Sequence, residues 1–352
     1  MSVVIPAYNA RDTLSATLDT VRSQTYRELE IIVVDDGSTD DTAELVRRVS
    51  AHDARVRLLQ QENQGVAAAR NLAISSANGP YIAPIDADDL WHPRKIELQM
   101  QVFRKSAVPL GFVYAWSRRI DEHGFAMADQ GEPDFQGNVF PQLLAYNFLN
   151  NASVAIFRRD SLIAIGGFDT SMQRSGAHGA EDLALALAIA EREPIGVAPC
   201  YLVGYRQIPG TMSADGLRMR RSMEIVLSEM EDDRPDLPAS LFQLGRMHAD
   251  LYASGLALNK RDWPLFGRLL ASGCIRSPNN AVRLLGCAML WRTRDLAGLT
   301  RSKTRFLDLQ PHERLPALPF QRWLDSRRAR VVRGIVSSHG KGLSGSRTVD
   351  VR

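Results

Sequence analysis

The chain has 352 residues, of which 45% are hydrophobic and 24% are charged, with a formal net charge of +3. This length suits one catalytic domain and a smaller second unit, and the composition is that of a globular protein. The cysteines lack paired spacing, which argues against a disulfide framework and a cysteine-rich zinc site. They are Cys200, Cys274 and Cys287.

The beginning of the chain has no leader pattern. It enters the apolar run Val3-Val4-Ile5 without a preceding basic stretch, and no apolar run of about 18 residues occurs in the sequence. The sequence therefore predicts neither a signal peptide nor a transmembrane helix. It indicates a cytoplasmic protein in a reducing compartment.

Strand and helix patterns alternate through the first 90 residues. Apolar β-branched runs predict strands, and apolar residues at three-to-four spacing predict the helices between them. The expected strands are 2–5, 30–34, 56–59 and 81–85, and the expected helices are 14–21, 39–49 and 65–77. This alternation predicts an α/β domain with a mainly parallel sheet flanked by helices. Its ligand site should lie at the C-terminal ends of the strands.

The rest of the chain is less regular and then becomes helical. Further strands are expected at 112–117, 153–157 and 195–205, a helix at 181–192, and helical segments at 239–257 and 264–271. We expect a catalytic domain over 1–213, a helical appendage over 214–312, and a basic, partly disordered tail over 313–352.

The C-terminal end is strongly basic. From Arg301 to Arg352 there are 12 Lys and Arg residues against 4 Asp and Glu residues, a net charge of +8. This charge favours peripheral contact with an anionic surface, such as the inner face of a membrane, and a solvated tail is the alternative. No nucleic acid partner is expected.

Three acidic groups lie in predicted loops or at a helix start. They are Asp35-Asp36 after one buried strand, Asp86-Ala87-Asp88-Asp89 after another, and Glu181-Asp182 behind a glycine-rich loop. A single group would be better explained as helix caps or turn residues. Three such groups favour a functional site, because Mg²⁺ or Mn²⁺ prefers oxygen ligands and bridges carboxylates to phosphates.

Several motifs occur in order along the chain. They are Val4-Ile5-Pro6-Ala7-Tyr8-Asn9, Val33-Val34-Asp35-Asp36-Gly37-Ser38-Thr39-Asp40, Asn63-Gln64-Gly65 with Ala69-Arg70-Asn71, Asp86-Ala87-Asp88-Asp89, Gly166-Gly167-Phe168-Asp169, Glu181-Asp182 and Tyr205-Arg206. Each motif is moderately specific, and the ordered set is highly specific. Over roughly residues 2–213 the chain resembles the family 2 glycosyltransferases, which have the GT-A fold.

The resemblance implies roles for the matched residues. Donor binding falls to Pro6, Ala7, Tyr8, Asp36, Gly65, Arg70, Asp86, Ala87 and Arg206. Asp88 is implied to be the ligand of a divalent metal, Mg²⁺ or Mn²⁺. Asp182 is implied to be the catalytic base, with Glu181 beside it in the acceptor site.

The implied activity is an inverting transfer of a sugar from a nucleotide-diphosphate donor, expected to be a UDP-sugar. The acceptor is a hydroxyl group of a polysaccharide, a lipid-linked sugar or another glycan. A metal ion stabilises the charge that develops on the leaving diphosphate, and a carboxylate activates the acceptor hydroxyl. One base without a covalent intermediate gives a single displacement and hence inversion.

One position departs from the family pattern. Family members often carry a histidine shortly after the Tyr-Arg pair, whereas Ile208 stands there in this chain. Metal binding would then depend on Asp88, the diphosphate and water, which suits Mg²⁺. His178 lies in the glycine-rich loop, where a lone histidine is expected to be solvated rather than a ligand.

Two other functions remain as alternatives. A non-catalytic sugar-nucleotide-binding protein would not need the acidic pair Glu181-Asp182, and a nucleotidyltransferase should show a basic, glycine-rich loop where Pro6-Ala7-Tyr8-Asn9 stands. Trp91 either faces the acceptor or packs in the core. Asn150-Asn151 either contacts acceptor hydroxyls or forms a turn.

Overall fold

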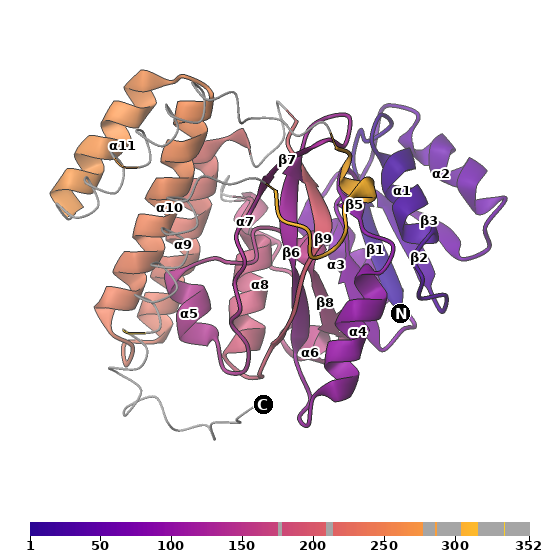
Figure 1. Cartoon of the computed structure of the whole chain (residues 1–352), viewed down its shortest axis with the longest axis horizontal. Coiled ribbons are helices and arrows are strands. Elements are labelled where there is room, and N and C mark those ends of the chain that lie inside the picture. Colours follow the sequence, from indigo (N-terminus) through magenta and orange to yellow (C-terminus); the bar gives the residue numbers. More distant parts are fainter. Residues whose placement is uncertain (175–177, 209–213, 277–285, 287–303, 316–333, 335–352) are drawn as a thin grey trace.

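The computed structural model describes residues 1–174, 178–208, 214–276, 286, 304–315 and 334 (Figure 1). Within these residues one mixed sheet is flanked by helices, so the predicted α/β class is confirmed. The strand order is β3-β2-β1-β4-β8-β6-β9-β5, with β7 paired to β6.

The first half of the sheet is parallel. Its strands are β1 (Ser2–Ala7), β2 (Glu30–Asp35), β3 (Val56–Gln60) and β4 (Tyr81–Pro84), and its helices are α1 (Leu14–Arg22), α2 (Thr42–Ser50) and α3 (Val66–Ser75). The apolar runs of β1 and β2 are buried, as expected of parallel strands covered by helices. Because these strands are parallel, the loops after β1, β2 and β4 begin at one edge of the sheet.

The second half of the sheet is mixed. Its strands are β5 (Leu90–Trp91), β6 (Phe112–Ile120), β7 (Ala126–Asp129), β8 (Ala155–Arg158) and β9 (Gly196–Arg206). The accompanying helices are α4 (Lys95–Lys105), α5 (Phe140–Ala145), α6 (Arg159–Ala164), α7 (Ser171–Arg174) and α8 (Glu181–Ala190), with a 3₁₀ turn η1 (Ala152–Val154). The antiparallel pairing of β5 with β9 places Leu90 opposite Gly204, so the end of β9 lies beside the loop that follows β4.

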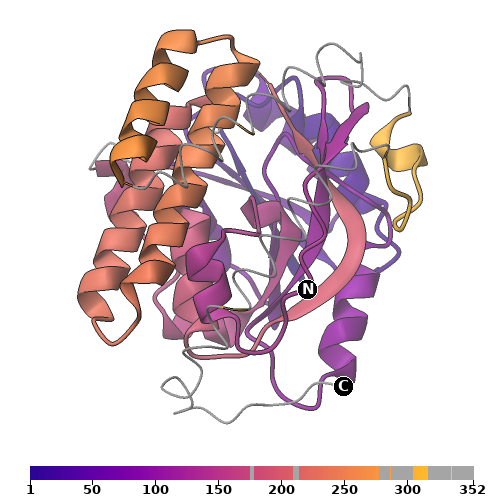
Figure 2. The same cartoon turned by 60° about the vertical axis from the view of Figure 1, so that its left-hand side comes forward.

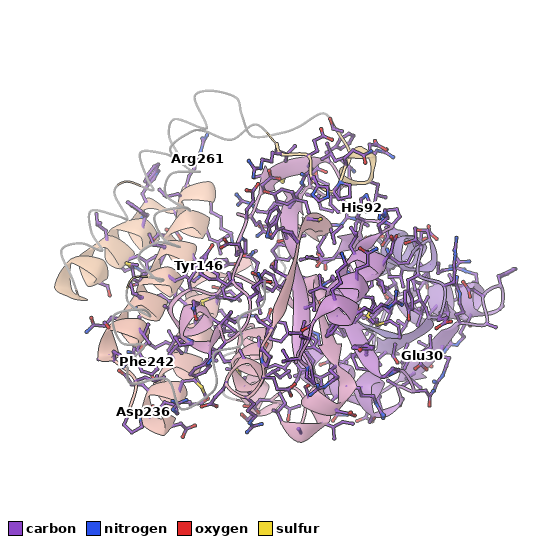
Figure 3. All side chains as sticks on the ribbon, turned by 60° about the horizontal axis from the view of Figure 1, so that its bottom comes forward. Glu30, His92, Tyr146, Asp236, Phe242 and Arg261 are labelled. Carbon is purple, nitrogen blue, oxygen red and sulfur yellow. The ribbon has the colours of Figure 1, made fainter. Side chains whose placement is uncertain are left out.

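The C-terminal helices pack directly onto the sheet domain. They are α9 (Gly216–Asp233), α10 (Ala239–Asn259) and α11 (Trp263–Arg276), and α10 contacts α5 while α9 contacts α8 (Figure 2). Val226 and Phe242 are buried in the same apolar cluster as the sheet, and Tyr146 packs edge-on against His248. Figure 3 labels Phe242 and Tyr146. The expected helical appendage therefore shares the main hydrophobic core.

Two glycines of α10 test how closely this helix approaches α5. A Cβ atom at Gly245 would lie 2.5 Å from the Leu144 carbonyl oxygen, whereas a Cβ at Gly255 would meet nothing within 4 Å. Gly245→Ala should therefore lower the free energy of unfolding by about 1–3 kcal/mol through overpacking. Gly255→Ala should raise it by about 0.5–1 kcal/mol, because alanine favours a helix interior. Urea unfolding of both variants measures the difference, and equal effects would contradict this packing.

Residues 304–315, called here the return segment, lie against the sheet domain near β5 and β7 (Figure 1). The segment contains a second 3₁₀ turn, η3 (Phe306–Asp308). The sequence predicts most of it within the helical appendage, but it contacts β9 and the turn between β6 and β7. The domain boundaries at 213 and 312 stay predictions, and the rest of the tail lies outside the described residues.

Candidate active site

The acidic loop (residues 86–89) follows β4 and is anchored by its last acid. Asp89 is fully buried, and its carboxylate accepts hydrogen bonds from the Arg206 amide at 3.0 Å and from Asn151 Nδ2 at 2.9 Å. Burial, together with the neighbouring acids of the loop, raises the pKa of Asp89 well above its ordinary value. Asp89 therefore fixes the loop, whereas Asp86 and Asp88 are only half-buried.

Asp88 and Asp86 have the chemistry of a cation site. Burial and the nearby Asp86 carboxylate raise the pKa of Asp88 to about 6. A divalent cation prefers such oxygen ligands and would relieve their repulsion, so these residues fit Mg²⁺ or Mn²⁺. Among the described residues no cluster of three His, Cys, Asp or Glu side chains is arranged to hold a metal. Phosphate oxygens and water would have to complete the coordination.

Arg206 braces the acidic loop from the end of β9. Its Nε donates to the Asp88 carbonyl at 2.6 Å, and its Nη1 donates to the carbonyls of Glu122 at 2.6 Å and Asp121 at 3.1 Å. The side chain is buried, with 4% of its surface exposed. In this structure the guanidinium is thus used to hold backbone, and its predicted role over the donor stays a prediction.

Asp36 organises the loop that precedes α3. Its carboxylate accepts from the Gln64 amide at 2.9 Å, the Gly65 amide at 2.8 Å and Gln61 Nε2 at 2.7 Å. Gly65 has φ of +86°, a conformation that favours glycine at this turn. A carboxylate has about four acceptor positions, so one remains for the predicted contact with a base N–H.

The three residues at the end of β1 differ in exposure. Pro6 and Ala7 are buried in the strand, and the Ala7 carbonyl accepts from the Asp36 amide at 2.8 Å. The Tyr8 side chain is 52% exposed. Of the three, only Tyr8 presents a side-chain surface to solvent, and the donor roles of all three stay predictions.

Arg70 connects the donor side with the third acidic group. Its Nη2 lies 2.5 Å from Asp86 Oδ1, and its guanidinium lies 5.0 Å from the centre of the Phe168 ring. Burial lowers the pKa of Arg70, but the charges of Asp86, Asp182 and Glu181 raise it by more. The pKa is therefore above its ordinary value. This buried cation therefore interacts with acids from the acidic loop and from α8.

A reciprocal pair of hydrogen bonds places Phe168 above Arg70. Asn71 Nδ2 donates to the Phe168 carbonyl and the Phe168 amide donates to Asn71 Oδ1, both at 2.8 Å. Gly167 has φ of +80°, and a Cβ atom there would lie 2.6 Å from Asn71 Oδ1. The Gly-Gly-Phe motif thus allows close contact with α3.

Glu181 and Asp182 begin α8 in different environments. Glu181 is 4% exposed, and its Oε2 accepts from the Gly179 amide at 2.8 Å. Asp182 is only half-buried, and its Oδ1 accepts from the Leu183 amide at 2.8 Å. Glu181 closes the turn before the helix, which leaves Asp182 as the more accessible acid.

The pKa of Asp182 is raised to about 7. Burial is the main cause, Arg70 opposes the shift, and the charges of Glu181 and Asp86 add to it. A carboxyl group with a pKa near neutrality can both take and release a proton under ordinary conditions, which suits a general base.

Sequence reasoning missed Tyr252 and Arg119. The pKa of Tyr252 is raised to about 12 by burial, with Arg119 lowering it and Asp182 raising it further, so the three groups lie within interacting range. Gly245, His248 and Tyr252 recur at helical spacing on α10, and the first two face α5 and its following loop. That spacing was the available signal, but only the folded structure brings Tyr252 within electrostatic range of Asp182.

The structure also decides two open interpretations and corrects one expectation. Trp91 is fully buried and stacks under the Lys95 ammonium at 4.0 Å from the ring centre, so it is a core residue. Asn150-Asn151 forms a turn, with φ of +68° at Asn150 and a buried side chain at Asn151. The expectation that His178 is solvated is wrong, because its Nε2 lies 3.1 Å from Arg218 Nη1 and its imidazole is held by α9.

Comparison with known proteins finds glycosyltransferases among the similar sequences and structures. Residues 2–166 match the family model for glycosyl transferase family 2. An uncharacterized glycosyltransferase of Rickettsia felis is 33% identical over 198 residues, covering 56% of this chain and 31% of the relative. The UDP-Glc:alpha-D-GlcNAc-diphosphoundecaprenol beta-1,3-glucosyltransferase WfaP of Escherichia coli is 40% identical over 109 residues, covering 31% of this chain and 43% of the relative. The chain thus spans less than half the length of either relative.

Two solved structures share the fold. Staphylococcus aureus TarS 1–349 in complex with UDP-GlcNAc has a TM-score of 0.54 at 16% identity, covering 99% of this chain and 94% of the neighbour. The mannosyltransferase PcManGT from Pyrobaculum calidifontis in complex with GDP-Man and Mn²⁺ has a TM-score of 0.54 at 20% identity, covering 98% of this chain and 87% of the neighbour. The GT-A fold is thus confirmed, and residues 2–166 have the sequence pattern of glycosyl transferase family 2.

Proposed function

We propose that the protein is an inverting glycosyltransferase that moves a sugar from a nucleotide-diphosphate donor to a hydroxyl group of a glycan or lipid-linked acceptor. The observation that carries this proposal is the convergence of acids around Arg70. Asp86 pairs with Arg70, and Arg70 also interacts electrostatically with Glu181 and Asp182. The donor-side acids and the candidate base therefore belong to one site.

The names of similar proteins support the choice of substrates. The TarS structure contains UDP-GlcNAc, and the name of WfaP specifies a UDP-Glc donor and a diphosphoundecaprenol acceptor. These names favour a UDP-sugar donor and a polysaccharide or lipid-linked acceptor for this chain. Asp36 and Tyr8 would contact the base and ribose, and Asp86 and Ala87 would lie along the donor.

Asp88, with Asp86 beside it, would hold a divalent cation against the diphosphate. When bound, Mg²⁺ or Mn²⁺ would stabilise the negative charge of the departing nucleoside diphosphate. The Mn²⁺ in the PcManGT complex supports this choice. Arg206 keeps the backbone of Asp88 in place through the Nε bond to its carbonyl.

Asp182 would act on the acceptor. Its ionised carboxylate takes the proton of the acceptor hydroxyl as the hydroxyl oxygen bonds to the anomeric carbon. The bond from that carbon to the diphosphate oxygen breaks in the same step, and the leaving diphosphate keeps the electron pair. Attack and departure occur on opposite sides of the carbon, which inverts its configuration. Tyr252 and Arg119 would border the acceptor beside this base.

A thermal-shift screen of nucleotide sugars with Mg²⁺, with Mn²⁺ and with EDTA tests this function. A donor that binds the native state raises the melting temperature, and a UDP-sugar with Mn²⁺ should give the largest shift. Positive donors are then incubated with glycan and polyprenyl-diphosphate sugar acceptors. Donor binding without transfer or hydrolysis would instead favour a non-catalytic binding protein, and release of pyrophosphate from a nucleoside triphosphate would favour a nucleotidyltransferase.

We also propose that the basic C-terminal segment contacts the inner face of an anionic membrane. In the described part of the chain, none of the helices has the length and apolar character needed to cross a bilayer. Removing residues 316–352 should reduce co-sedimentation with phosphatidylglycerol vesicles at low salt and leave UDP binding intact. A cut at 300 would be unsuitable, because it also removes the return segment. If the full-length protein did not co-sediment with these vesicles at low salt, the proposal would be contradicted.

A further inference from the structure

The return segment is joined to the sheet domain by backbone hydrogen bonds. The Ala126 amide donates to the Thr304 carbonyl at 3.0 Å, and the Phe306 amide donates to the Gly124 carbonyl at 2.9 Å. Further along, the Tyr201 amide donates to a carbonyl of the segment at 2.8 Å. These bonds fix the segment beside the β6–β7 turn and β9.

Phe306 fills the space behind the acidic loop. Its side chain is 1% exposed and packs with Leu90 and Ile120 in a cluster separate from the main core. A Cβ atom at Gly204 would lie 2.9 Å from Phe306 Cδ1, so the ring also touches β9. Leu90 follows the acidic loop directly, so the Phe306 ring supports the residue at the end of that loop.

The same segment supports Arg206 from a second side. The Phe306 amide donates a hydrogen bond to the Gly124 carbonyl in the β6–β7 turn. The same turn supplies the Asp121 and Glu122 carbonyls that accept hydrogen bonds from the Arg206 guanidinium. Arg206 in turn holds the backbone of the acidic loop. The loop is therefore supported through Leu90 on one side and through Arg206 on the other.

The acidic loop needs such support because its charges repel. The carboxyl groups of Asp86, Asp88 and Asp89 occur within four residues, and like charges this close repel one another. Without a rigid frame the loop would relax to separate its charges, and the geometry for a cation and a diphosphate would be lost.

We propose that Phe306 is a positioning residue, which holds the acidic loop in the conformation that binds a divalent cation with a nucleoside diphosphate. The proposal rests on the proposed function for its ligand. The structural claim, that Phe306 keeps the acidic loop ordered in the ligand-free protein, is independent of that function. Because the Phe306 cluster is separate from the main core, the effect should be local.

Hydrogen–deuterium exchange in full-length, ligand-free protein tests the structural part. Phe306→Ala should speed exchange of residues 86–92 and 204–208 by about tenfold or more, and Phe306→Leu should restore most of the protection. Phe266→Ala is the matched control, because Phe266 is also buried but lies in the separate cluster between α10 and α11. Unchanged exchange near the acidic loop in Phe306→Ala would overturn the proposal.

Calorimetry with UDP tests the ligand part. Phe306→Ala should weaken UDP binding about tenfold with Mn²⁺ present and leave the affinity in EDTA unchanged, since disturbing the support of a metal ligand costs about 10–100-fold in metal affinity. An equal loss with Mn²⁺ and with EDTA, or the same loss in Phe266→Ala, would overturn the positioning role. If wild-type protein bound no nucleoside diphosphate, the proposed function would fail, and the exchange experiment would still decide the role of Phe306.

Discussion

Asp182→Asn should reduce turnover by about 100-fold or more while donor affinity is retained, because asparagine keeps the size of the side chain but cannot accept the acceptor proton. The residues predicted to bind the donor are left intact, and all of them except Arg206 come from the first half of the sheet. Turnover and UDP affinity, measured on the same preparation, separate catalysis from binding.

Asp160→Asn is the matched control for this change. Asp160 is an exposed acid in the first turn of α6, just as Asp182 lies in the first turn of α8. Asparagine also caps helices well, so a purely structural role for Asp182 would leave turnover almost unchanged. Near-normal transfer by Asp182→Asn would remove it from catalysis and make Glu181 the next candidate.

The pH dependence of wild-type turnover should report the same group. A base must be ionised, and the pKa of Asp182 is raised to about 7, so turnover should rise with pH and level off above neutrality. Below pH 7 the rate should fall about tenfold for each pH unit as the carboxyl becomes protonated. The residual activity of Asp182→Asn should lack this fall in rate below pH 7. If the variant still shows the same fall, another group is responsible for it.

Asp88→Asn should remove the metal-dependent part of donor binding. Loss of a supporting residue costs about 10–100-fold in metal affinity, so loss of the ligand itself should weaken UDP binding in Mn²⁺ by about 100-fold or more. Titration calorimetry with Mn²⁺ and with EDTA measures this difference. Equal UDP affinity of the wild type under both conditions would show that the metal assignment is wrong.

The same substitution should not destabilise the free protein. The pKa of Asp88 is raised to about 6, so its ionised form is disfavoured in the fold at neutral pH, and asparagine removes that cost. The melting temperature of the metal-free variant should therefore equal or exceed that of the wild type. Asp12→Asn, in the exposed segment between β1 and α1, controls for the change in net charge and should leave UDP binding unaltered.

Much of the fold could be predicted because its signals are local. The buried runs of β1 and β2 give clear strand patterns, and the acids directly after β2 and β4 mark the ends of parallel strands. β5 has only two residues and no periodicity, and its position depends on pairing with β9. Local patterns could not predict the position of the return segment either. Its hydrogen-bond partners lie about 100 or more residues earlier in the chain.

The site was predicted in outline but not in its connections. Local sequence placed Asp88 and Asp182 in separate loops or helix starts, and family resemblance supplied their roles. It could not show that Arg70 interacts with acids from both groups, or that Tyr252 lies within electrostatic range of Asp182. These interactions arise from the packing of elements that are distant in the sequence. The burial of Trp91 likewise follows from tertiary packing.

The shared core of the sheet domain and α10 sets the limits of the smallest foldable polypeptide. The match to the family model ends at residue 166. The apolar cluster that begins at β1, however, also includes Phe242 of α10. A fragment ending at 213 would leave that cluster open to water and should aggregate when expressed alone. Moreover, α10 carries both Phe242 and Tyr252. If Tyr252 borders the acceptor as proposed, substitutions that adapt this helix to a new acceptor must also preserve the packing of Phe242 in the core.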